Sequence, residues 1–363
     1  MAATHEAVQA ALSNFIDPNT QKDYVSTRAL RNLKVEDGQV SFDVELGYPA
    51  QTQLETIRTA LTSAVSAVPG VTGVTANVTM KIVAHTVQRS LKPLPGVKNI
   101  IAVASGKGGV GKSTTAVNLA LALAAEGVGV GLLDADIYGP SVPQMLGLTG
   151  QHPESEDGKI IEPLRAFGLQ AMSIGFMVDI DSPMIWRGPM VTRTLEQLLV
   201  QTRWQDLDYL IVDMPPGTGD TQLTLAQKVP VTGAVIVTTP QDIALIDARK
   251  GFKMFEKVGV PILGLVENMS LHICPKCGHE EHIFGTGGAQ RMARDYDVEL
   301  LGALPLELEI RELTDAGKPT VVGAPFSRAA DLYRSIARRV GVKIAERAKD
   351  MSGKFPNIVV QNA

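Results

Sequence analysis

Two sets of residues in this chain could do chemistry, and they point to different kinds of site. The chain of 363 residues has only two cysteines, which lie close together in Cys274-Pro-Lys-Cys277. The second set is a loop rich in glycine and lysine around Lys112. A metal centre that needs four thiolates cannot be completed by two cysteines, so the pair is half of a site or part of a mixed-ligand one. Because a twofold dimer presents the same surface twice, two chains would supply four thiolates.

The loop matches the phosphate-binding pattern G-x-x-x-x-G-K-[ST], with a predicted strand before it and a predicted helix after it. Its glycines allow successive backbone N–H groups to point at phosphates near the positive end of that helix. Lys112 would reach the β- and γ-phosphates of ATP, and the Ser113 hydroxyl would ligate Mg²⁺. We expect the nucleotide to be held by Gly106, Lys107, Gly108, Gly109, Val110, Gly111, Lys112, Ser113 and Thr114.

Polar side chains end three further apolar runs. Asp134 and Asp136 follow one run, and Asp213 ends another. Carboxylates at the carboxyl edge of a parallel sheet face the ligand crevice, so we expect them beside the nucleotide. Asn268 ends a third run, and its amide offers the donor and acceptor that the N6/N7 edge of adenine requires. A purely turn-forming asparagine is the alternative for that residue.

The cysteine pair admits three interpretations. Zinc held within one chain would recruit His279 and His282, but all four ligands would then fall within nine residues, without the usual loop between ligand pairs. A redox dithiol should open a helix, and Gly278 with the histidines after it does not resemble a helix start. Two cysteines from each subunit of a dimer could instead hold one [4Fe–4S] cluster. This third interpretation explains why the chain has only two cysteines.

The apolar pattern predicts two structural units and a linker. Residues 1–89 are predicted to form a small α+β domain, because helical and alternating segments follow each other around the turn Asp37-Gly38. Residues 90–98 contain two prolines and a glycine and are predicted to be a linker. From residue 99 to 363, short continuous apolar runs alternate with helical segments. This pattern predicts a doubly wound α/β domain with a mostly parallel P-loop sheet flanked by helices.

Composition excludes several classes of partner. The formal net charge is −4 and there is no basic block, so binding to nucleic acid has no electrostatic support. The apolar stretch 116–133 contains Asn118 and Glu126 and breaks at Gly127, whereas a membrane span needs about 20 apolar residues. The N-terminal residues do not resemble a secretory signal. We expect a cytoplasmic protein that binds neither nucleic acid nor membrane.

Several motifs together resemble one family. The second lysine of the loop, Lys107, is typical of the "deviant Walker A" P-loop ATPases. The full set resembles the Mrp/ApbC iron–sulfur cluster carrier ATPases over residues 99–326, and residues 1–89 are similar to the MIP-like domain that precedes the ATPase in bacterial members. The motifs that carry the resemblance are the loop itself, Asp134-Ala-Asp-Ile-Tyr-Gly-Pro-Ser141, Asp213-Met-Pro-Pro-Gly-Thr-Gly-Asp220, Val266-Glu-Asn-Met-Ser270 and Cys274-Pro-Lys-Cys277.

The resemblance implies roles for individual residues. It implies a homodimer in which Lys107 reaches across to the partner's nucleotide, while Asp213 holds a Mg²⁺-bound water and Asp136 orients the attacking water. It implies that Asn268 binds adenine and that Cys274 and Cys277 of both chains hold the cluster. Weak ATP hydrolysis would be coupled to transfer of the cluster. The partners would be scaffold proteins as cluster donors and apo iron–sulfur proteins as acceptors.

Two other functions use the same loop. A partitioning or positioning ATPase would act as a switch on DNA or membrane, with a structural zinc at the cysteine pair. Its C-terminal helix would have to bind a surface, but that helix has a single aromatic residue, Tyr333, which favours a packed role. A nitrogenase-type electron donor also bridges a cluster between subunits, but that group takes its cysteines from two distant segments. We therefore expect a cluster carrier.

Overall fold

The computed structural model describes residues 3–88, 91–155, 158–178 and 188–347. Its main element is an eight-stranded sheet in the order β13-β10-β9-β4-β8-β5-β7-β6, parallel except for the last pair. The strands are β4 (Val97–Ala104), β5 (Val130–Asp134), β6 (Leu164–Ala166), β7 (Leu169–Ser173), β8 (Leu207–Asp213), β9 (Gly233–Thr238), β10 (Ile262–Glu267) and β13 (Leu300–Ala303).

The central strands are apolar because helices cover both of their faces. All five residues of β5 and all six of β9 are buried, and β4 is buried at every position except Lys98. Strands buried on both sides need no alternation of polar and apolar residues, which explains the continuous apolar runs. The prediction of a doubly wound, mostly parallel sheet preceded by a small α+β unit is confirmed.

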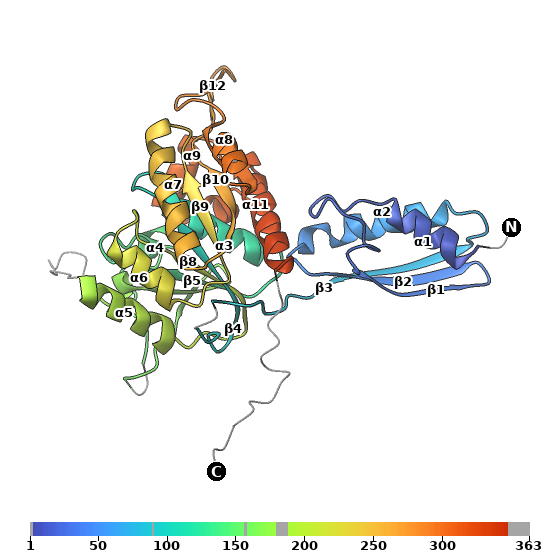
Figure 1. The fold of residues 1–363 in the computed structure, drawn as a ribbon, viewed down its shortest axis with the longest axis horizontal. Helices are drawn as coiled ribbons and strands as arrows, with labels where there is room; N and C mark the ends of the chain where they lie inside the picture. Colours follow the sequence, from blue (N-terminus) through green and yellow to red (C-terminus); the bar gives the residue numbers. More distant parts are fainter. Residues whose placement is uncertain (1–2, 89–90, 156–157, 179–187, 348–363) are drawn as a thin grey trace, which may run out of the picture.

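Helices pack on the two faces of the sheet (Figure 1). The helix after β4, α3, packs against α11, and α7 packs between α6 and α8. Right-handed crossovers that run in opposite directions from the middle of the sheet place α3 and α7 on opposite faces. The helices of this unit are α3 (Lys112–Ala125), α4 (Val142–Met145), α5 (Gly188–Gln201), α6 (Asp220–Lys228), α7 (Asp242–Lys257), α8 (Gly288–Asp295), α9 (Leu308–Asp315), α10 (Thr320–Gly323) and α11 (Arg328–Ala345).

The N-terminal unit is a three-stranded sheet with two helices against one face (Figure 1). Its elements are α1 (His5–Ser13), β1 (Leu30–Glu36), β2 (Gln39–Leu46), α2 (Leu54–Ser66) and β3 (Gly73–Met80). In β2, Val40, Phe42, Val44 and Leu46 are buried while the residues between them are more exposed. This alternation is typical of a sheet with one face on a core and the other in water.

Side chains from both units meet at the C-terminal end of α3. Glu126, with no exposed surface, accepts hydrogen bonds from the Thr52 backbone N–H at 3.0 Å and the Thr52 hydroxyl at 2.8 Å. The same carboxylate pairs with Arg338 of α11. Val342 of α11 is part of the N-terminal core. The end of α3, the N-terminal unit and α11 are therefore held together by a buried carboxylate.

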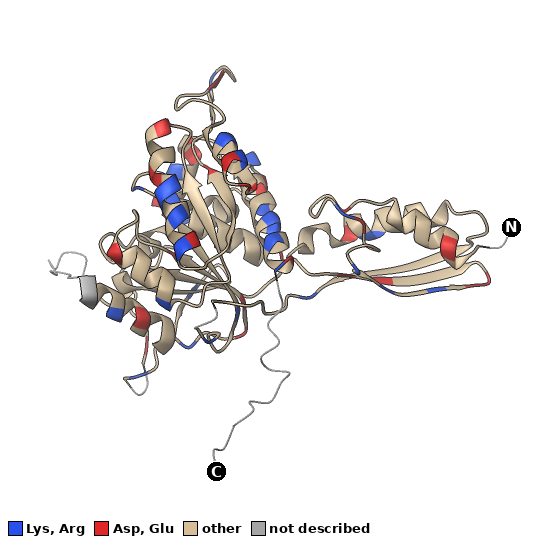
Figure 2. Cartoon of the chain, viewed as in Figure 1, with Lys and Arg blue, Asp and Glu red and all other residues tan. Residues whose placement is uncertain are grey.

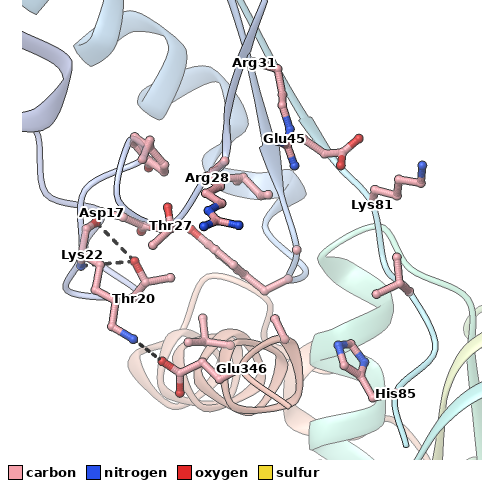
Figure 3. A pocket seen from close by; sticks show the side chains of 18 residues that line it. Asp17, Thr20, Lys22, Thr27, Arg28, Arg31, Glu45, Lys81, His85 and Glu346 are labelled. Carbon is pink, nitrogen blue, oxygen red and sulfur yellow. Dashed lines mark hydrogen bonds and ion pairs between the residues drawn. The ribbon is translucent and has the colours of Figure 1, made fainter. Parts of the chain in front are cut away.

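A cavity of about 320 Å³ opens beside this junction (Figure 3). Lys22 of the N-terminal unit donates to Glu346, just beyond α11, at 2.8 Å. Arg28 and Arg31 line the same cavity from the N-terminal unit, and His85 lines it from the segment that leads to β4. The junction is thus polar at its rim and apolar near Val342.

Several elements differ from their predicted bounds. Strand β4 begins at Val97, inside the predicted linker 90–98. The C-terminal helix that contains Tyr333 is α11, which ends at Ala345. The strands β6, β7 and β13 were not predicted, because their short sequences show little pattern of their own; β6 and β13 lie at the two edges of the sheet. Within the described residues, no helix is both long and apolar enough to cross a membrane.

Candidate nucleotide site and cysteine pair

The phosphate-binding loop joins β4 to α3 at the carboxyl edge of the sheet. Gly109 and Gly111 adopt φ of +81° and +80°, which favour glycine over every other residue. Gly106 is required for a different reason, since a Cβ there would lie 2.1 Å from the backbone carbon of Asp247 in α7. These glycines allow the tight turn from β4 into α3. At the N-terminus of α3, backbone N–H groups and the helix dipole favour an anion.

Lys112 and Asp213 form a buried ion pair at the centre of the site. The ammonium lies 2.6 Å from Asp213 Oδ1, and the two side chains are 6% and 0% exposed. Lys112 also donates to Ser113 Oγ at 3.1 Å. Asp213 Oδ2 is buried and has no hydrogen-bond partner within the described part of the chain. Ser113 Oγ, as a ligand, and the Asp213 carboxylate, as an acceptor for metal-bound water, both lie beside the Lys112 ammonium, an arrangement that fits Mg²⁺.

Asp134 and Asp136 have different surroundings. The buried Asp134 carboxylate accepts from the Asp136 and Val142 backbone N–H groups at 3.1 and 3.2 Å, and from Ser173 Oγ at 3.0 Å. Burial, together with the nearby negative charge of Asp213, raises the pKa of Asp134 to about 7. Burial also raises the pKa of Asp136, against the effect of Lys112, which lowers it. Asp134 therefore fixes the loop that carries Asp136.

Ser173 is a site residue that sequence reasoning missed. It ends β7, and its hydroxyl donates to Asp134 Oδ2. The strand it belongs to is short and was not predicted, so no pattern connected Ser173 with the acidic residues. A polar residue after a buried apolar stretch was the only available signal.

Lys107 is half-buried in the loop. Its backbone carbonyl accepts from the Ser105 hydroxyl at 2.9 Å, which fixes the backbone. Its ammonium has no hydrogen bond or ion pair with another described residue. The contact across a dimer that the sequence suggests remains a prediction, since it concerns a second chain.

Asn268 contacts the loop directly. Its side-chain amide donates to the Val110 carbonyl at 2.9 Å, and a Cβ on Gly111 would lie 2.1 Å from Asn268 Nδ2. Asn268 is also held through its backbone N–H, which donates to the Thr238 carbonyl at 2.7 Å. In this arrangement the amide connects the end of β10 to the phosphate loop, and its role toward adenine stays a prediction.

The cysteine pair lies in the turn of a small hairpin, between β11 (His272–Ile273) and β12 (Glu280–Glu281). The hairpin projects from the body of the molecule (Figure 1). Both cysteines are free thiols; Cys274 is partly exposed and Cys277 is exposed. The Cys274 backbone N–H donates to the His279 carbonyl at 2.9 Å, which closes the turn.

Hydrogen bonds favour the thiolate of Cys274. The backbone N–H groups of Lys276 and Cys277, and then the Cys277 thiol, lower the pKa of Cys274. A thiolate is the form that binds metal. Among the described residues no group of three or more His, Cys, Asp and Glu is close enough to hold a metal ion. His282 instead forms a hydrogen bond with the Ser270 carbonyl at 2.8 Å.

The cysteine hairpin and the phosphate loop leave the same edge of the sheet. The loop follows β4 and the hairpin follows β10, and both strands are parallel members of the sheet. Asn268, which contacts the loop, lies four residues before His272, where the hairpin begins. The two candidate sites are therefore connected by a short stretch of chain.

Comparison with known proteins identifies the family. The model described as "NUBPL iron-transfer P-loop NTPase" matches residues 96–341. The chain belongs to this family. A second model, "Iron-sulfur cluster assembly protein", matches residues 5–78. The resemblance to iron–sulfur cluster carrier ATPases is thereby confirmed.

Curated relatives are named as iron–sulfur cluster carrier or transfer proteins. An "Iron-sulfur cluster carrier protein" of Escherichia coli K12 is 48% identical over 353 residues, covering 97% of this chain and 96% of its own. One from Pseudomonas fragi is 60% identical over 257 residues, covering 70% of this chain and 90% of its own. The "Iron-sulfur cluster transfer protein NUBPL" of Mus musculus is 56% identical over 251 residues, covering 69% and 78%.

Solved structures agree on the fold. A nucleotide-binding protein from Archaeoglobus fulgidus, in complex with ADP and with cobalt found in it, has a TM-score of 0.55 and 38% identity, covering 61% of this chain and 88% of its own. The cell division ATPase MinD of Pyrococcus furiosus has a TM-score of 0.52 and 24% identity, covering 67% and 98%. The second likeness shows the fold alone. This chain is a P-loop NTPase of a family whose named relatives are iron–sulfur cluster carriers.

Proposed function

We propose that the protein is a homodimeric, ATP-hydrolysing carrier that holds one [4Fe–4S] cluster between its subunits and passes it to apoproteins. The observation that supports this most is the cysteine hairpin. It presents two thiols and no third ligand among the described residues, at the sheet edge that also holds the phosphate loop. Four thiolates are the usual complement of a [4Fe–4S] cluster, so a second chain would complete the site.

ATP binding would begin by exchanging the partner of Lys112. The ammonium now contacts Asp213, and the γ-phosphate would compete for it from the loop above. If Lys112 moved to the phosphates, both Asp213 oxygens would be free to accept hydrogen bonds from water, and Ser113 Oγ, which now contacts Lys112, would be the residue to hold Mg²⁺. A bound Mg²⁺ would neutralise charge that grows on the phosphates. In the absence of nucleotide, Asp213 thus keeps the Lys112 ammonium in the site.

Hydrolysis needs a positioned water and a further positive charge. The Asp136 backbone N–H donates to the buried Asp134 carboxylate, which holds Asp136 at the edge of the site, and its carboxylate is proposed to orient the attacking water. Lys107 is proposed to reach the partner subunit's phosphates as an arginine finger does. Asn268 is proposed to bind adenine while it holds the phosphate loop. ATP would in this way favour one arrangement of the two subunits over another.

The remaining partners follow from the proposal. Scaffold proteins would load the cluster and apo iron–sulfur proteins would receive it, in the cytoplasm, where thiols stay reduced. Neither nucleic acid nor membrane is expected as a partner. Residues 1–89 are proposed to be a domain of their own, joined to the ATPase domain by the segment that ends where β4 begins, at Val97. A partitioning ATPase with zinc at the hairpin is not favoured, because it gives the cysteine pair no role in the ATPase cycle.

Transfer to an apoprotein tests the proposal. Protein reconstituted anaerobically with iron and sulfide is mixed with an apo-enzyme whose activity requires a [4Fe–4S] cluster, with Mg²⁺ and either ATP or ADP. We expect recovery of that activity, and a different rate with ATP than with ADP. The Lys112→Ala variant should bind the cluster but show equal rates with both nucleotides. Recovery that is the same with free iron and sulfide as with the loaded protein would refute the carrier function.

A further inference from the structure

A shallow groove of about 480 Å³ crosses the face of the molecule formed by α6, α7 and the end of α8. Its residues come from the loop before α6, from α6 itself, from the C-terminal half of α7 and from Tyr296 after α8. These elements pack against one another, so the groove has a fixed shape. We call it the α7 groove. No residue of the phosphate loop or of the cysteine hairpin lines it.

Four cations line the α7 groove, and no carboxylate lines it. They are exposed and lie on the C-terminal half of α7 (Figure 2). Three of them pair with carboxylates outside the groove, at 3.5, 3.0 and 2.7 Å, and two of these carboxylates are exposed while the third, Asp247, is half-buried. Exposed pairs of this kind contribute little and exchange partners readily. The cations are Arg249, Lys250, Lys253 and Lys257.

The floor of the α7 groove is apolar. Leu223 of α6, Met254 of α7 and Tyr296 contribute to it. The Tyr296 ring is fixed against Phe252 with centroids 4.4 Å apart, and Lys253 Nζ lies 5.4 Å from its centroid. Methionine adapts to apolar side chains of different shape, and an aromatic ring offers a large rigid contact. A row of cations beside such a floor is complementary to a segment that carries carboxylates and apolar side chains together.

The α7 groove also contacts the nucleotide-binding region. Thr218 lines it and belongs to the segment 215–220 that follows Asp213. In that segment the Gly217 N–H donates to the Ser105 carbonyl, directly before the phosphate loop, at 3.0 Å. Gly251 of α7 faces Thr218, because a Cβ there would lie 3.9 Å from Thr218 Cγ2. A segment that occupies the groove would therefore lie against the loop beside the nucleotide.

We propose that the α7 groove docks an acidic amphipathic segment of a partner protein. Charge complementarity supports this occupant, because the row of four cations would attract and orient the carboxylates of such a segment. Only the identity of the partner rests on the proposed function: it would be a donor or an acceptor of the cluster. Docking itself needs no cluster.

Peptide binding to the full-length protein tests the proposal. The probe is a fluorescein-labelled peptide that alternates glutamate with leucine and phenylalanine, and fluorescence anisotropy reports its binding in the presence of Mg-ADP. The test variant is Lys253→Glu with Lys257→Glu. The matched control is Arg31→Glu with Lys34→Glu, which reverses two cations of the N-terminal sheet. We expect the test variant to weaken binding about tenfold or more, and the control to leave it unchanged.

A second variant distinguishes docking in the groove from non-specific electrostatic attraction of the acidic peptide. Leu223→Ser keeps every charge and removes part of the floor, and we expect it also to weaken peptide binding. Equal weakening by the test and control variants, or none by either, would overturn the proposal. A change in oligomer mass with unchanged peptide binding would show that the groove contacts a second copy instead, and would also overturn it. Iron bound after reconstitution tests the carrier function separately: wild-type protein that binds no iron would count against the carrier function and would leave the peptide-binding result standing.

Discussion

The side chains proposed to act on ATP neutralise one another in the structure. Lys112 and Asp213 are buried together, and Asp134 is buried beside them with three hydrogen-bond donors. Removing one member of a buried ion pair typically costs about 3–5 kcal/mol of stability, because the other charge stays buried without a partner. The same residues therefore affect both folding and nucleotide chemistry. For variants at these positions, ATP hydrolysis and the free energy of unfolding both have to be measured.

The Asp213→Asn variant should lose activity and stability together. We expect ATP hydrolysis to fall by about 100-fold or more, because the carboxylate that would hold Mg²⁺-bound water is gone. The free energy of unfolding should fall by about 3 kcal/mol, because Lys112 loses its counter-charge. Phosphate release and urea denaturation measure the two effects. Asp37→Asn, in an exposed turn, is the control and should change neither; wild-type hydrolysis by Asp213→Asn would remove this carboxylate from the mechanism.

Stability should depend on pH through Asp134. Its pKa is about 7 in the folded chain, against an ordinary value of 3.8. Between these values the folded protein keeps a proton that the unfolded chain has lost, so Asp134 makes stability fall as pH rises from about 4 to 7. Relative to the wild type, Asp134→Asn should gain up to about 1.4 kcal/mol per pH unit across this window. Urea denaturation at pH 5, 6, 7 and 8 measures the difference, and a constant difference would contradict the raised pKa.

At the scale of elements, α3 connects the nucleotide site to the N-terminal unit. Lys112 is its first residue, and Glu126, directly after its last, accepts from Thr52 and pairs with Arg338. A shift of α3 on ATP binding would therefore displace Glu126 and alter its contacts with Thr52 and Arg338. This link joins residues far apart in the sequence. It is carried by a buried charge instead of an apolar contact.

Glu126→Gln should weaken this junction. The substitution leaves Arg338 half-paired in a buried position, so we expect the free energy of unfolding to fall by about 3 kcal/mol. Thermal and urea denaturation of the full chain measure it. Glu55→Gln is the matched control, because Glu55 is exposed and pairs only with Arg58 three residues away. It should change stability by less than about 0.5 kcal/mol; equal effects of the two variants would mean that the Glu126 contacts contribute nothing.

The sequence predicted the long elements and the phosphate loop, and missed contacts between distant segments. Central strands such as β9 and the loop around Lys112 are encoded in continuous local patterns, which can be read without the fold. Ser173 and Glu126 acquire their roles only from packing, because each contacts residues of another element. Asn268 was predicted to be a site residue, and its contact with the phosphate loop was not, since the contact joins segments 158 residues apart.

At the scale of the whole molecule, the account requires two chains. Each chain presents a complete phosphate loop but only two thiols. The Lys107 ammonium has no hydrogen bond or ion pair with another described residue of its own chain. Both observations are explained if a second copy faces the sheet edge from which the loop and the hairpin project.

Mixed dimers test the contribution of Lys107 across the interface. Lys107→Ala and Lys112→Ala should each be inactive in ATP hydrolysis as homodimers, because every site lacks one lysine. After mixing, half of the chains form mixed dimers in which one of the two sites has both lysines, so about a quarter of wild-type activity should return. Phosphate release from equimolar mixtures measures it. No recovery, in a mixture shown to exchange subunits, would mean that Lys107 acts within its own chain.

Iron counting in a sample of known mass tests whether one cluster bridges two subunits. The full-length protein is reconstituted anaerobically, and iron, sulfide and oligomer mass are measured on the same fraction. The account predicts a dimer with about two irons per chain and broad absorbance near about 400 nm, with no cluster in the Cys277→Ala variant. A monomer that holds its own metal, or a Cys277→Ala protein with a full cluster, would contradict it.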